Sequence, residues 1–268
     1  MPPVTRPNAA TIAGPVATFA IVAPALFMSS VDATVVAVGL NTMTAELNTN
    51  LAWMGWTLTG YQLTQTVAMP VAGRLSDEWG RKRLFLAAVL LFTLSSVLAG
   101  LSPNVYALIL CRVVQAIGGG AFMPAATGLV SDAFDKRRAT ALGLFTSIFP
   151  LGGILGPNLG GFIIDNLSWH WIFYVNVPLG LAILWFGWRY LRPDEDHSAR
   201  QRPPFDVAGV GLFAGALLAL MLGLTRLADY PAEGFTMLAG APLAIGVVLL
   251  GALVWNERRA PAPLIEVT

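Results

Sequence analysis

Long apolar runs recur along the whole 268-residue chain, and they constrain its fold more than any other feature. An α-helix needs about 20 predominantly apolar residues to cross the hydrocarbon core of a bilayer. Hydrophobic residues make up 56% of the chain and charged residues only 12%, about half of the share that soluble proteins carry. The sequence therefore predicts an all-α, polytopic membrane protein with eight spans, near residues 16–40, 52–72, 84–101, 105–127, 140–163, 171–190, 207–228 and 236–255.

Basic residues gather in alternate loops between these spans. If the N-terminus is cytoplasmic, 14 of the 16 lysines and arginines fall on the cytoplasmic side, while Arg226 falls outside and Arg112 lies within a span. Cytoplasmic loops carry such an excess of positive charge, and the opposite orientation would reverse the count. We therefore expect both termini in the cytoplasm and the chain in a cell membrane, the bacterial inner membrane. We expect the first run to be an uncleaved helix, because Asp32 lies well inside it.

Residues suited to redox, metal or nucleic-acid chemistry are scarce. Cys111 is the single cysteine, which excludes an internal disulfide, and His170 and His197 lie in different loops. The net charge of +1 conceals strong local segregation and gives no sign of nucleic-acid binding. We expect no cofactor, no metal site and no nucleic-acid partner, and we expect the lipid bilayer to surround the chain.

A dense cluster of charges and glycines, residues 73–83, forms the predicted loop between the second and third spans. Gly80 would permit a tight turn, and Asp77 could pair with Arg81 or cap a neighbouring helix. The alternative is a plain basic loop that only fixes topology. The pattern resembles the signature between the second and third spans of the major facilitator superfamily, at Gly73, Leu75, Asp77, Gly80, Arg81, Lys82 and Arg83.

Two opposite charges lie deep within predicted spans. Arg112 begins a run that resembles the fourth-helix motif of the same superfamily, and Asp32 lies in the first span. Each is about eight residues, or roughly 12 Å, from the outer end of its helix, so the two share a depth. We predict that they pair or share water, with a proton at Asp32 releasing Arg112. Alternatively, Arg112 snorkels to the outer interface, or the two remain a buried pair that never titrates.

A glycine-rich stretch with one proline, residues 152–161, lies in the fifth span and resembles the superfamily's antiporter motif. Pro157 would bend the helix, while the glycines would form a smooth stripe against which another helix can rock. A simple packing seam is the alternative. Together with the cluster at 73–83, the resemblance implies a conformational gate made of Gly73, Asp77, Gly80, Arg81, Gly152, Gly156, Pro157, Gly160 and Gly161.

Two further stretches narrow the resemblance to the branch of drug:proton antiporters with 14 spans. Residues 31–36 are similar to that branch's first-helix motif, and residues 169–178 are similar to its approach to span six. The tryptophans of the second stretch predict a belt at the membrane interface. Polar and adaptable apolar side chains could line a substrate cavity, or pack between helices instead; they are Phe27, Met28, Tyr61, Gln65, Gln115, Phe145 and Phe149.

The resemblance divides the chain into a six-span bundle (residues 1–191), a cytoplasmic connector (192–206), two extra spans (207–256) and a cytoplasmic tail (257–268). Asp206 is placed to cap the seventh helix. The resemblance implies a secondary active transporter, not an enzyme. It would export small hydrophobic or cationic drugs in exchange for protons, and this chain would be its N-terminal portion.

Such transporters rock two bundles about a shared site, so we expect a partner, either a separate C-terminal half or a second copy of the chain. Two other functions stay open at this point. The chain could be a truncated remnant or membrane interaction partner that does not transport, or it could be a proton-coupled symporter of a polar solute.

Overall fold

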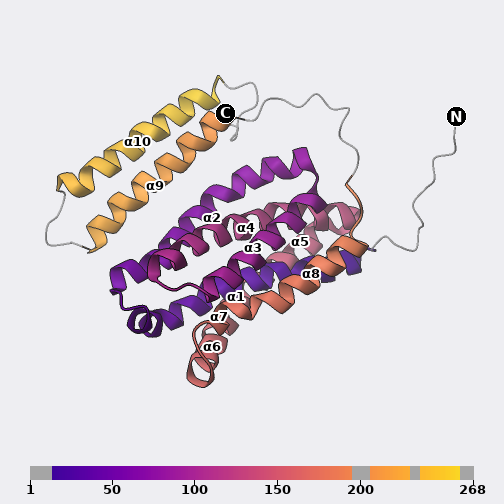
Figure 1. Cartoon of the computed structure of the whole chain (residues 1–268). Coiled ribbons are helices and arrows are strands. Elements are labelled where there is room, and N and C mark those ends of the chain that lie inside the picture. The colour runs from indigo at the N-terminus through magenta and orange to yellow at the C-terminus, as the bar shows by residue number, and fades with distance from the viewer. Residues whose placement is uncertain (1–13, 195–205, 230–235, 260–268) are drawn as a thin grey trace. The chain divides into compact units, whose positions relative to one another are not determined.

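The computed structural model describes residues 14–194, 206–229 and 236–259 (Figure 1). The chain divides into two compact units, residues 1–196 and 197–268. Within the described residues all regular structure is helical, which confirms the predicted all-α fold. The N-terminal Arg6 and most of the predicted connector and C-terminal tail lie outside the described residues.

The first unit is a bundle of long helices with two interrupted ones. Its helices are α1 (Pro15–Glu46), α2 (Leu51–Trp79), α3 (Arg81–Gly100), α4 (Val105–Ala133), α5 (Arg138–Thr146), α6 (Ile148–Asn166), α7 (Trp171–Tyr174) and α8 (Asn176–Tyr190). Asn50 and Asn104 cap α2 and α4, each accepting a hydrogen bond from the backbone N–H three residues later, at 2.9 Å.

Seven helical segments within the described residues are long and apolar enough to cross a membrane. They include α5 with α6 as one segment and α7 with α8 as another. The remaining predicted span falls in α2, which has the same length as α4, 29 residues, and packs beside it. Polar side chains such as Tyr61, Gln62 and Gln65 make α2 less apolar than its neighbours.

The predicted loop at residues 73–83 is wrong. Helix α2 continues to Trp79 and α3 begins at Arg81, so that Gly80 alone joins them. Gly80 adopts a positive φ of 99°, a conformation that other residues adopt only with strain, so the predicted tight turn is confirmed. The charged residues on either side of Gly80 therefore belong to the last turns of α2 and the first turn of α3.

The fifth and sixth predicted spans are each built from two helices, and a proline lies four residues after the end of the first helix in both. A proline has no N–H for the carbonyl four residues before it. Pro150 thus leaves the carbonyl of Thr146 without its helical donor, and α5 ends at Thr146. Pro178 does the same to Tyr174, where α7 ends.

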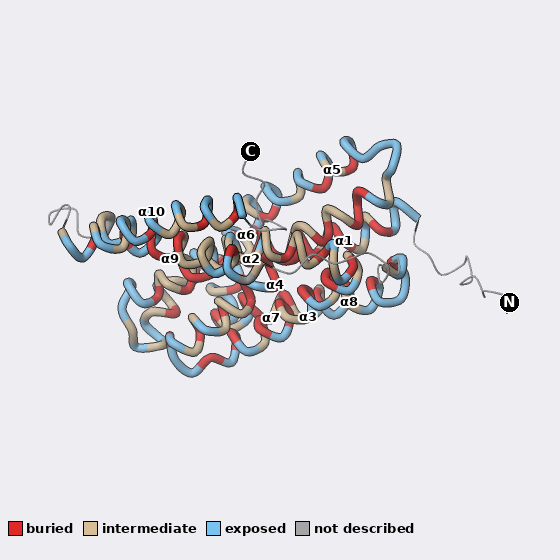
Figure 2. The backbone as a smooth tube through the Cα atoms, turned by 90° about the horizontal axis from the view of Figure 1, so that it is seen from above, coloured by how far each residue is buried: buried red, intermediate tan, exposed pale blue. Residues whose placement is uncertain are grey.

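The core of the bundle lies along α1, α3 and α4 (Figure 2). In the most apolar stretches of α1, α3 and α4, 61%, 56% and 56% of the residues are buried. In the segment that contains α5 and α6, only 22% are buried. The predicted tryptophan belt is wrong for Trp169, which is 1% exposed and donates its indole N–H to Glu46 at 2.8 Å. Trp171 is 49% exposed, as a belt requires.

The second unit is a pair of helices, α9 (Val207–Asp229) and α10 (Met237–Glu257). Asp206 accepts a hydrogen bond from the backbone N–H of Gly209 at 2.8 Å, which confirms the predicted cap. The two helices approach closely at glycines: a Cβ added to Gly246 would lie 2.6 Å from the Leu220 side chain. Small residues permit this kind of close packing between membrane helices.

Candidate functional site

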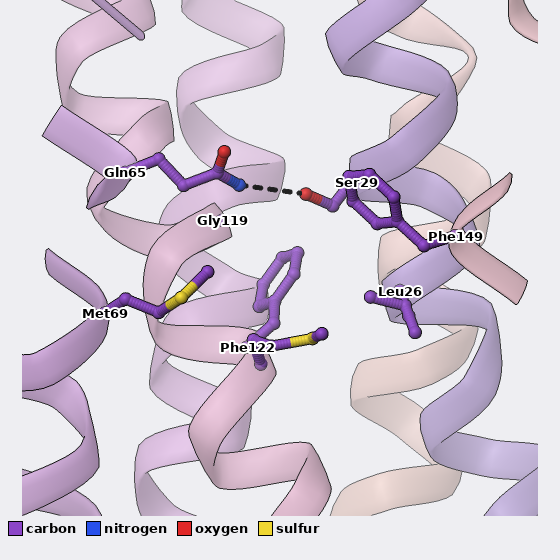
Figure 3. A pocket seen from close by; sticks show the side chains of 8 residues that line it. Leu26, Ser29, Gln65, Met69, Gly119, Phe122 and Phe149 are labelled. Carbon is purple, nitrogen blue, oxygen red and sulfur yellow. Dashed lines mark hydrogen bonds between the residues drawn. The ribbon is translucent and has the colours of Figure 1, made fainter. Parts of the chain in front are cut away.

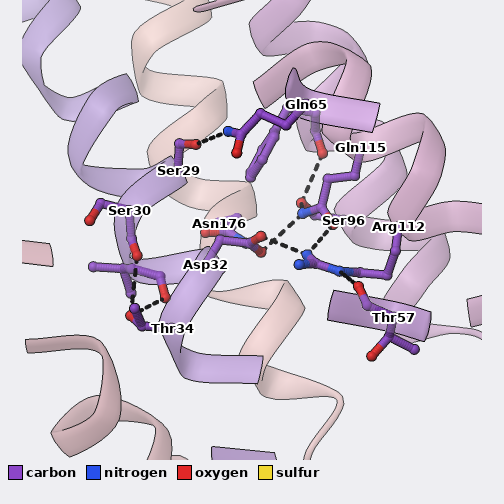
Figure 4. A network of polar contacts seen from close by, with 12 residues as sticks. Ser29, Ser30, Asp32, Thr34, Thr57, Gln65, Ser96, Arg112, Gln115 and Asn176 are labelled. Carbon is purple, nitrogen blue, oxygen red and sulfur yellow. Dashed lines mark hydrogen bonds and ion pairs between the residues drawn. The ribbon is translucent and has the colours of Figure 1, made fainter. Parts of the chain in front are cut away.

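Asp32 of α1 and Arg112 of α4 form an ion pair at the centre of the bundle (Figure 4). The Arg112 Nη1 atom donates to Asp32 Oδ2 at 2.6 Å, and both side chains are 0% exposed. The contact confirms the predicted proximity and shows that the Arg112 side chain is buried within the bundle instead of snorkelling to its surface. A buried ion pair is retained at a substantial desolvation cost, so its surroundings must compensate both charges.

Two amides share the Asp32 carboxylate with Arg112. Gln115, one helical turn after Arg112, donates to Asp32 Oδ1 at 3.0 Å, and Asn176 of α8 donates to the same oxygen at 2.9 Å. Gln115 also accepts from Arg112 Nη1 at 2.7 Å and donates to the hydroxyl of Ser96 in α3 at 2.8 Å. The network therefore joins α1, α3, α4 and α8 through the Asp32 carboxylate.

The guanidinium of Arg112 has partners other than Asp32. Its Nε atom donates to the backbone carbonyl of Thr57 in α2 at 3.4 Å, and its Cζ atom lies 4.0 Å from the centre of the Tyr61 ring. An aromatic face attracts such a cation, and the attraction is stronger where water is excluded. Among the described side chains, Arg112 Nη2 and the Tyr61 hydroxyl are buried without a hydrogen-bond partner.

Glycines of α4 allow neighbouring helices to reach this network. A Cβ at Gly118 would lie 2.7 Å from the backbone oxygen of Ala88 in α3, and one at Gly120 would lie 2.7 Å from that of Gln65 in α2. A Cβ at Gly119 would lie 2.7 Å from the Tyr61 hydroxyl. Each contact is shorter than real Cβ atoms make, so larger residues would push α2 and α3 away from α4.

A cavity of about 160 Å³ lies beside the network, between α1, α2, α4 and α6 (Figure 3). Of the predicted cavity residues, Gln65 and Phe149 line it. Gln65 donates to the Ser29 hydroxyl at 3.4 Å across the cavity wall. The other lining residues were not predicted; they are Leu26, Ser29, Met69, Gly119, Phe122 and Met123.

The remaining predicted cavity residues lie elsewhere in the bundle. Met28 and Phe145 are buried in the hydrophobic core, at 1% and 0% exposed, and Phe27 packs against a second core cluster. Tyr61 and Gln115 belong to the polar network. The cavity wall is therefore mostly apolar, with methionine and aromatic side chains that can adapt to different shapes.

Arg81, at the start of α3, is held against the end of α4. It forms an ion pair with Asp132 and donates to the backbone carbonyl of Gly128 at 2.9 Å. The Asp77 Oδ1 atom lies 3.9 Å from Arg81 Nη2, but the Asp77 side chain is 74% exposed. This second ion pair is therefore a weak surface contact. Gly73 lies within α2, where a Cβ would be at an ordinary 3.8 Å from Pro124.

Asp194 caps α3 from beyond the end of α8, a contact that the sequence did not predict. Its two carboxylate oxygens accept from the backbone N–H groups of Lys82 and Arg83, at 2.8 and 3.0 Å. The Lys82 ammonium group in turn donates to the carbonyls of Trp188 and Leu191 at 3.0 and 2.7 Å. These contacts fasten the end of α8 to the start of α3.

Replacing Asp194 with alanine is expected to lower the free energy of unfolding by about 1 kcal/mol, the usual value of a helix cap. Unfolding of the detergent-purified chain in increasing denaturant measures the change. Asp77→Ala is the matched control, because this exposed acid caps no helix in the described residues. Equal effects of the two substitutions would contradict the assignment of Asp194 as the cap.

The glycine stripe of α6 packs on α1; the sequence predicts a packing stripe but does not identify the partner helix. A Cβ at Gly152 would lie 2.6 Å from Ser30, and one at Gly160 would lie 2.9 Å from Val35. Ser30 also donates to the backbone carbonyl of Phe149 at 2.5 Å, so α1 hydroxyls satisfy carbonyls of α6. Pro157 is exposed, and a Cβ at Gly161 would meet nothing within 4 Å, so these two lie off the seam.

Gly156→Ala is expected to destabilise the bundle by about 1–3 kcal/mol, the range for overpacking. Its added Cβ would collide with Thr34 and lie 3.2 Å from the backbone oxygen of Val31. Gly153→Ala is the control in the same helix, because a Cβ there meets nothing within 4 Å. Melting temperatures in detergent that fall equally for both variants would contradict the seam.

Comparison with known proteins places this architecture in a family. The sequence profile of the Major Facilitator Superfamily matches residues 22–256, most of the chain. The chain belongs to this superfamily. It is a multi-pass membrane protein of a family of transporters rather than of enzymes.

Curated relatives of the chain are named as multidrug transporters. Multidrug transporter protein MdtP of Bacillus subtilis is 34% identical over 90% of this chain and 44% of its own length. Multidrug resistance protein B homolog of Mycobacterium tuberculosis is 35% identical over 89% of this chain and 44% of its own length. The chain therefore spans a little under half the length of these relatives.

Solved structures confirm the fold at low sequence identity. The crystal structure of a D-xylose–proton symporter matches with a TM-score of 0.56 at 14% identity, covering 90% of this chain and 67% of the symporter. A bacterial homologue of the human lysosomal transporter Spinster matches with the same TM-score at 17% identity, covering 92% of this chain and 63% of its own.

Proposed function

We propose that this chain forms one bundle of a proton-coupled exporter of hydrophobic or cationic compounds. The observation that carries the proposal is the fully buried Asp32–Arg112 pair beside an apolar cavity. Ionisable residues within the membrane are costly and in transporters mark ion and substrate pathways. The names of the relatives support drug export as the direction of transport.

Asp32 is the proposed proton site. A proton on the carboxylate would remove its charge and weaken the contact with Arg112. The guanidinium would still have the Gln115 amide oxygen, the Thr57 carbonyl and the Tyr61 ring. Protonation would therefore loosen α1 from α4 without leaving Arg112 in an apolar environment, as a cycle between two arrangements requires.

The composition of the cavity wall supports the substrate class. Aromatic faces attract organic cations, and flexible methionine side chains adapt to many shapes. Ser29 and Gln65 supply the polar groups of the wall, and its remaining lining residues are apolar or glycine. Such a wall offers little to a hydroxyl-rich polar solute, which favours export of drugs over the symport of sugars or similar nutrients.

The proposed gate consists of two sets of contacts, one at the α2–α3 junction and one along the glycine seam between α1 and α6. Arg81, Asp132 and Asp194 hold the α2–α3 junction to the ends of α4 and α8. The α1–α6 glycine seam provides a smooth surface for rocking. A rocking mechanism needs a second bundle to form the other wall of the site, so we propose a further half or a second copy as the partner.

We propose an orientation with Ala139, between α4 and α6, on the cytoplasmic side and Leu101 and Asn166 outside. Single cysteines at these exposed positions, in a Cys111→Ala background, test it in sealed cells. An impermeant thiol reagent added outside is expected to label Leu101→Cys and Asn166→Cys but not Ala139→Cys. Labelling of Ala139→Cys in intact cells would overturn the orientation.

The proposed function is tested by joining this chain to the portion of MdtP that it does not match. Inverted vesicles containing the chimera are expected to accumulate ethidium when their interior is acidified, and to lose it when a protonophore collapses the gradient. The chain alone is expected to insert but not to concentrate the dye, because one cavity wall is missing. A second chimera with the corresponding portion of the M. tuberculosis relative guards against a failure specific to one fusion.

Each alternative function has its own outcome in this assay. Chimeras that insert and stay monodisperse but never accumulate any cation would favour a non-transporting role. Proton-driven accumulation of a polar solute on the cytoplasmic side, which is opposite to the direction of export, would favour symport. Robust dye uptake by a demonstrated monomer of the chain alone would show that the requirement for two bundles is wrong.

A further inference from the structure

Tyr61 of α2 lies between the cavity and the Asp32–Arg112 pair. The face of its ring carries the guanidinium of Arg112 at 4.0 Å. Its hydroxyl, at the far end of the ring, lies against Gly119, which lines the cavity. One rigid side chain therefore touches both the proposed proton site and the wall of the proposed substrate site.

The Tyr61 hydroxyl is buried and has no hydrogen-bond partner. Buried polar groups without partners are uncommon in native proteins, and each calls for an explanation. Two polar groups of the cavity wall lie close by. The Gln65 amide nitrogen approaches the same side of Gly119, and Ser29 lies near the hydroxyl without meeting hydrogen-bond geometry.

Gln65 is the group best able to change partners. Its bond to Ser29 is long, at 3.4 Å, and both residues line the cavity (Figure 3). A molecule that fills the cavity would push on this bond. The Gln65 amide would then have the unpartnered Tyr61 hydroxyl within reach, and a new bond there would fix the ring on which Arg112 rests.

We infer that Tyr61 is the positioning residue that couples occupancy of the cavity to the Asp32–Arg112 pair. This inference rests on the proposed function. Cavity occupancy fixes the Tyr61 ring, the fixed ring holds the Arg112 guanidinium beside Asp32, and the guanidinium weakens the hold of Asp32 on a proton. Substrate and proton then oppose each other through one side chain, without sharing an atom.

The experiment uses the purified chain with tetraphenylphosphonium as the probe and follows the carboxyl infrared band of Asp32, identified by its loss in Asp32→Asn. In the unaltered chain, saturating probe is expected to lower the titration midpoint of Asp32 by at least about 0.7 pH units, equivalent to fivefold coupling. Tyr61→Phe keeps the ring and removes the hydroxyl. It is expected to bind the probe but to lose most of this shift.

Two further variants separate coupling from stability. Tyr106→Phe is the matched control, because Tyr106 is 61% exposed and its ring packs against Trp53 rather than against the network, and it is expected to keep the full shift. Gly119→Ala, whose added Cβ would press on the Tyr61 hydroxyl from 2.7 Å, is expected to reduce the shift as Tyr61→Phe does. A purely structural role for Tyr61 would lower the melting temperature and leave the shift intact.

The outcomes distinguish this inference from the proposed function. An Asp32 band that titrates and shifts equally in Tyr61→Phe overturns only the coupling role of Tyr61. A band that never titrates overturns both, and a chain that binds no probe overturns the inference alone. A shift lost in Tyr61→Phe and Gly119→Ala but kept in Tyr106→Phe supports the inference.

Discussion

Replacing Asp32 with asparagine is expected to abolish cation export driven by a proton gradient, while the protein still folds and inserts. Asparagine has nearly the same shape but cannot exchange a proton at neutral pH. Arg112 keeps Gln115, the Thr57 carbonyl and the Tyr61 ring as partners, so the variant resembles the protonated state of the proposed cycle. Ethidium accumulation in inverted vesicles containing the MdtP chimera measures the effect.

Asp165→Asn is the control for this experiment. Asp165 is exposed near the end of α6, and its substitution makes the same chemical change outside the network. The control is expected to export at the unaltered rate, and both variants are compared at equal amounts of inserted protein. Proton-driven export that persists in Asp32→Asn would remove Asp32 from the mechanism.

Replacing Arg112 with leucine is expected to destabilise the bundle by about 3–5 kcal/mol, the range for removing one partner of a buried ion pair. The Asp32 carboxylate would be left with only the amides of Gln115 and Asn176 as partners. Adding Asp32→Asn to Arg112→Leu removes the uncompensated charge. The double variant is therefore expected to recover much of the lost stability.

A double-mutant cycle on the chain in detergent measures this coupling. Unfolding free energies are compared for the unaltered chain, the two single variants and the double variant. Recovery in the double variant would show that the loss in Arg112→Leu arises from an unpaired charge. Additive losses would contradict the pair as the origin and point instead to lost packing of the long arginine side chain.

The ion pair can be predicted from the sequence because each residue of an α-helix adds a fixed rise along its axis, so that a residue's position in a span gives its depth in the membrane. Asp32 and Arg112 are each about eight residues from the outer end of a span, and 1.5 Å per residue puts them at one level. The glycine stripe of α6 is predicted in the same way, because residues four apart share a helix face. Periodicity therefore accounts for the contacts that depend on position along a single helix.

Contacts that depend on how helices are rotated and arranged could not be predicted. Asn176 reaches Asp32 only because α8 packs against α1, and Ser96 reaches Gln115 only because α3 packs against α4. Depth says nothing about which neighbours a side chain faces. The same reason explains the cavity, where residue type indicated Phe27 and Met28 but the packed helices present Leu26 and Ser29.

Average tendencies of residue types explain the other errors. Tryptophans favour the membrane interface on average, but Trp169 is buried because Glu46 accepts its indole N–H and Phe173 packs at its edge. A cluster of charges suggests a loop, but here the charges lie on helix ends next to Gly80. The cap from Asp194 crosses 112 residues of sequence, and no local pattern signals it.

Whether Asp32 exchanges a proton inside the bundle decides between a coupling site and a permanently locked pair. Infrared titration of the purified chain, with isotope-labelled aspartate, measures this directly through the carboxyl band of a protonated side chain. The proposed function predicts a band that appears as the pH falls, while the fold stays intact, and that is missing in Asp32→Asn. A spectrum in which the unaltered chain and Asp32→Asn show the same bands until the chain unfolds would contradict it.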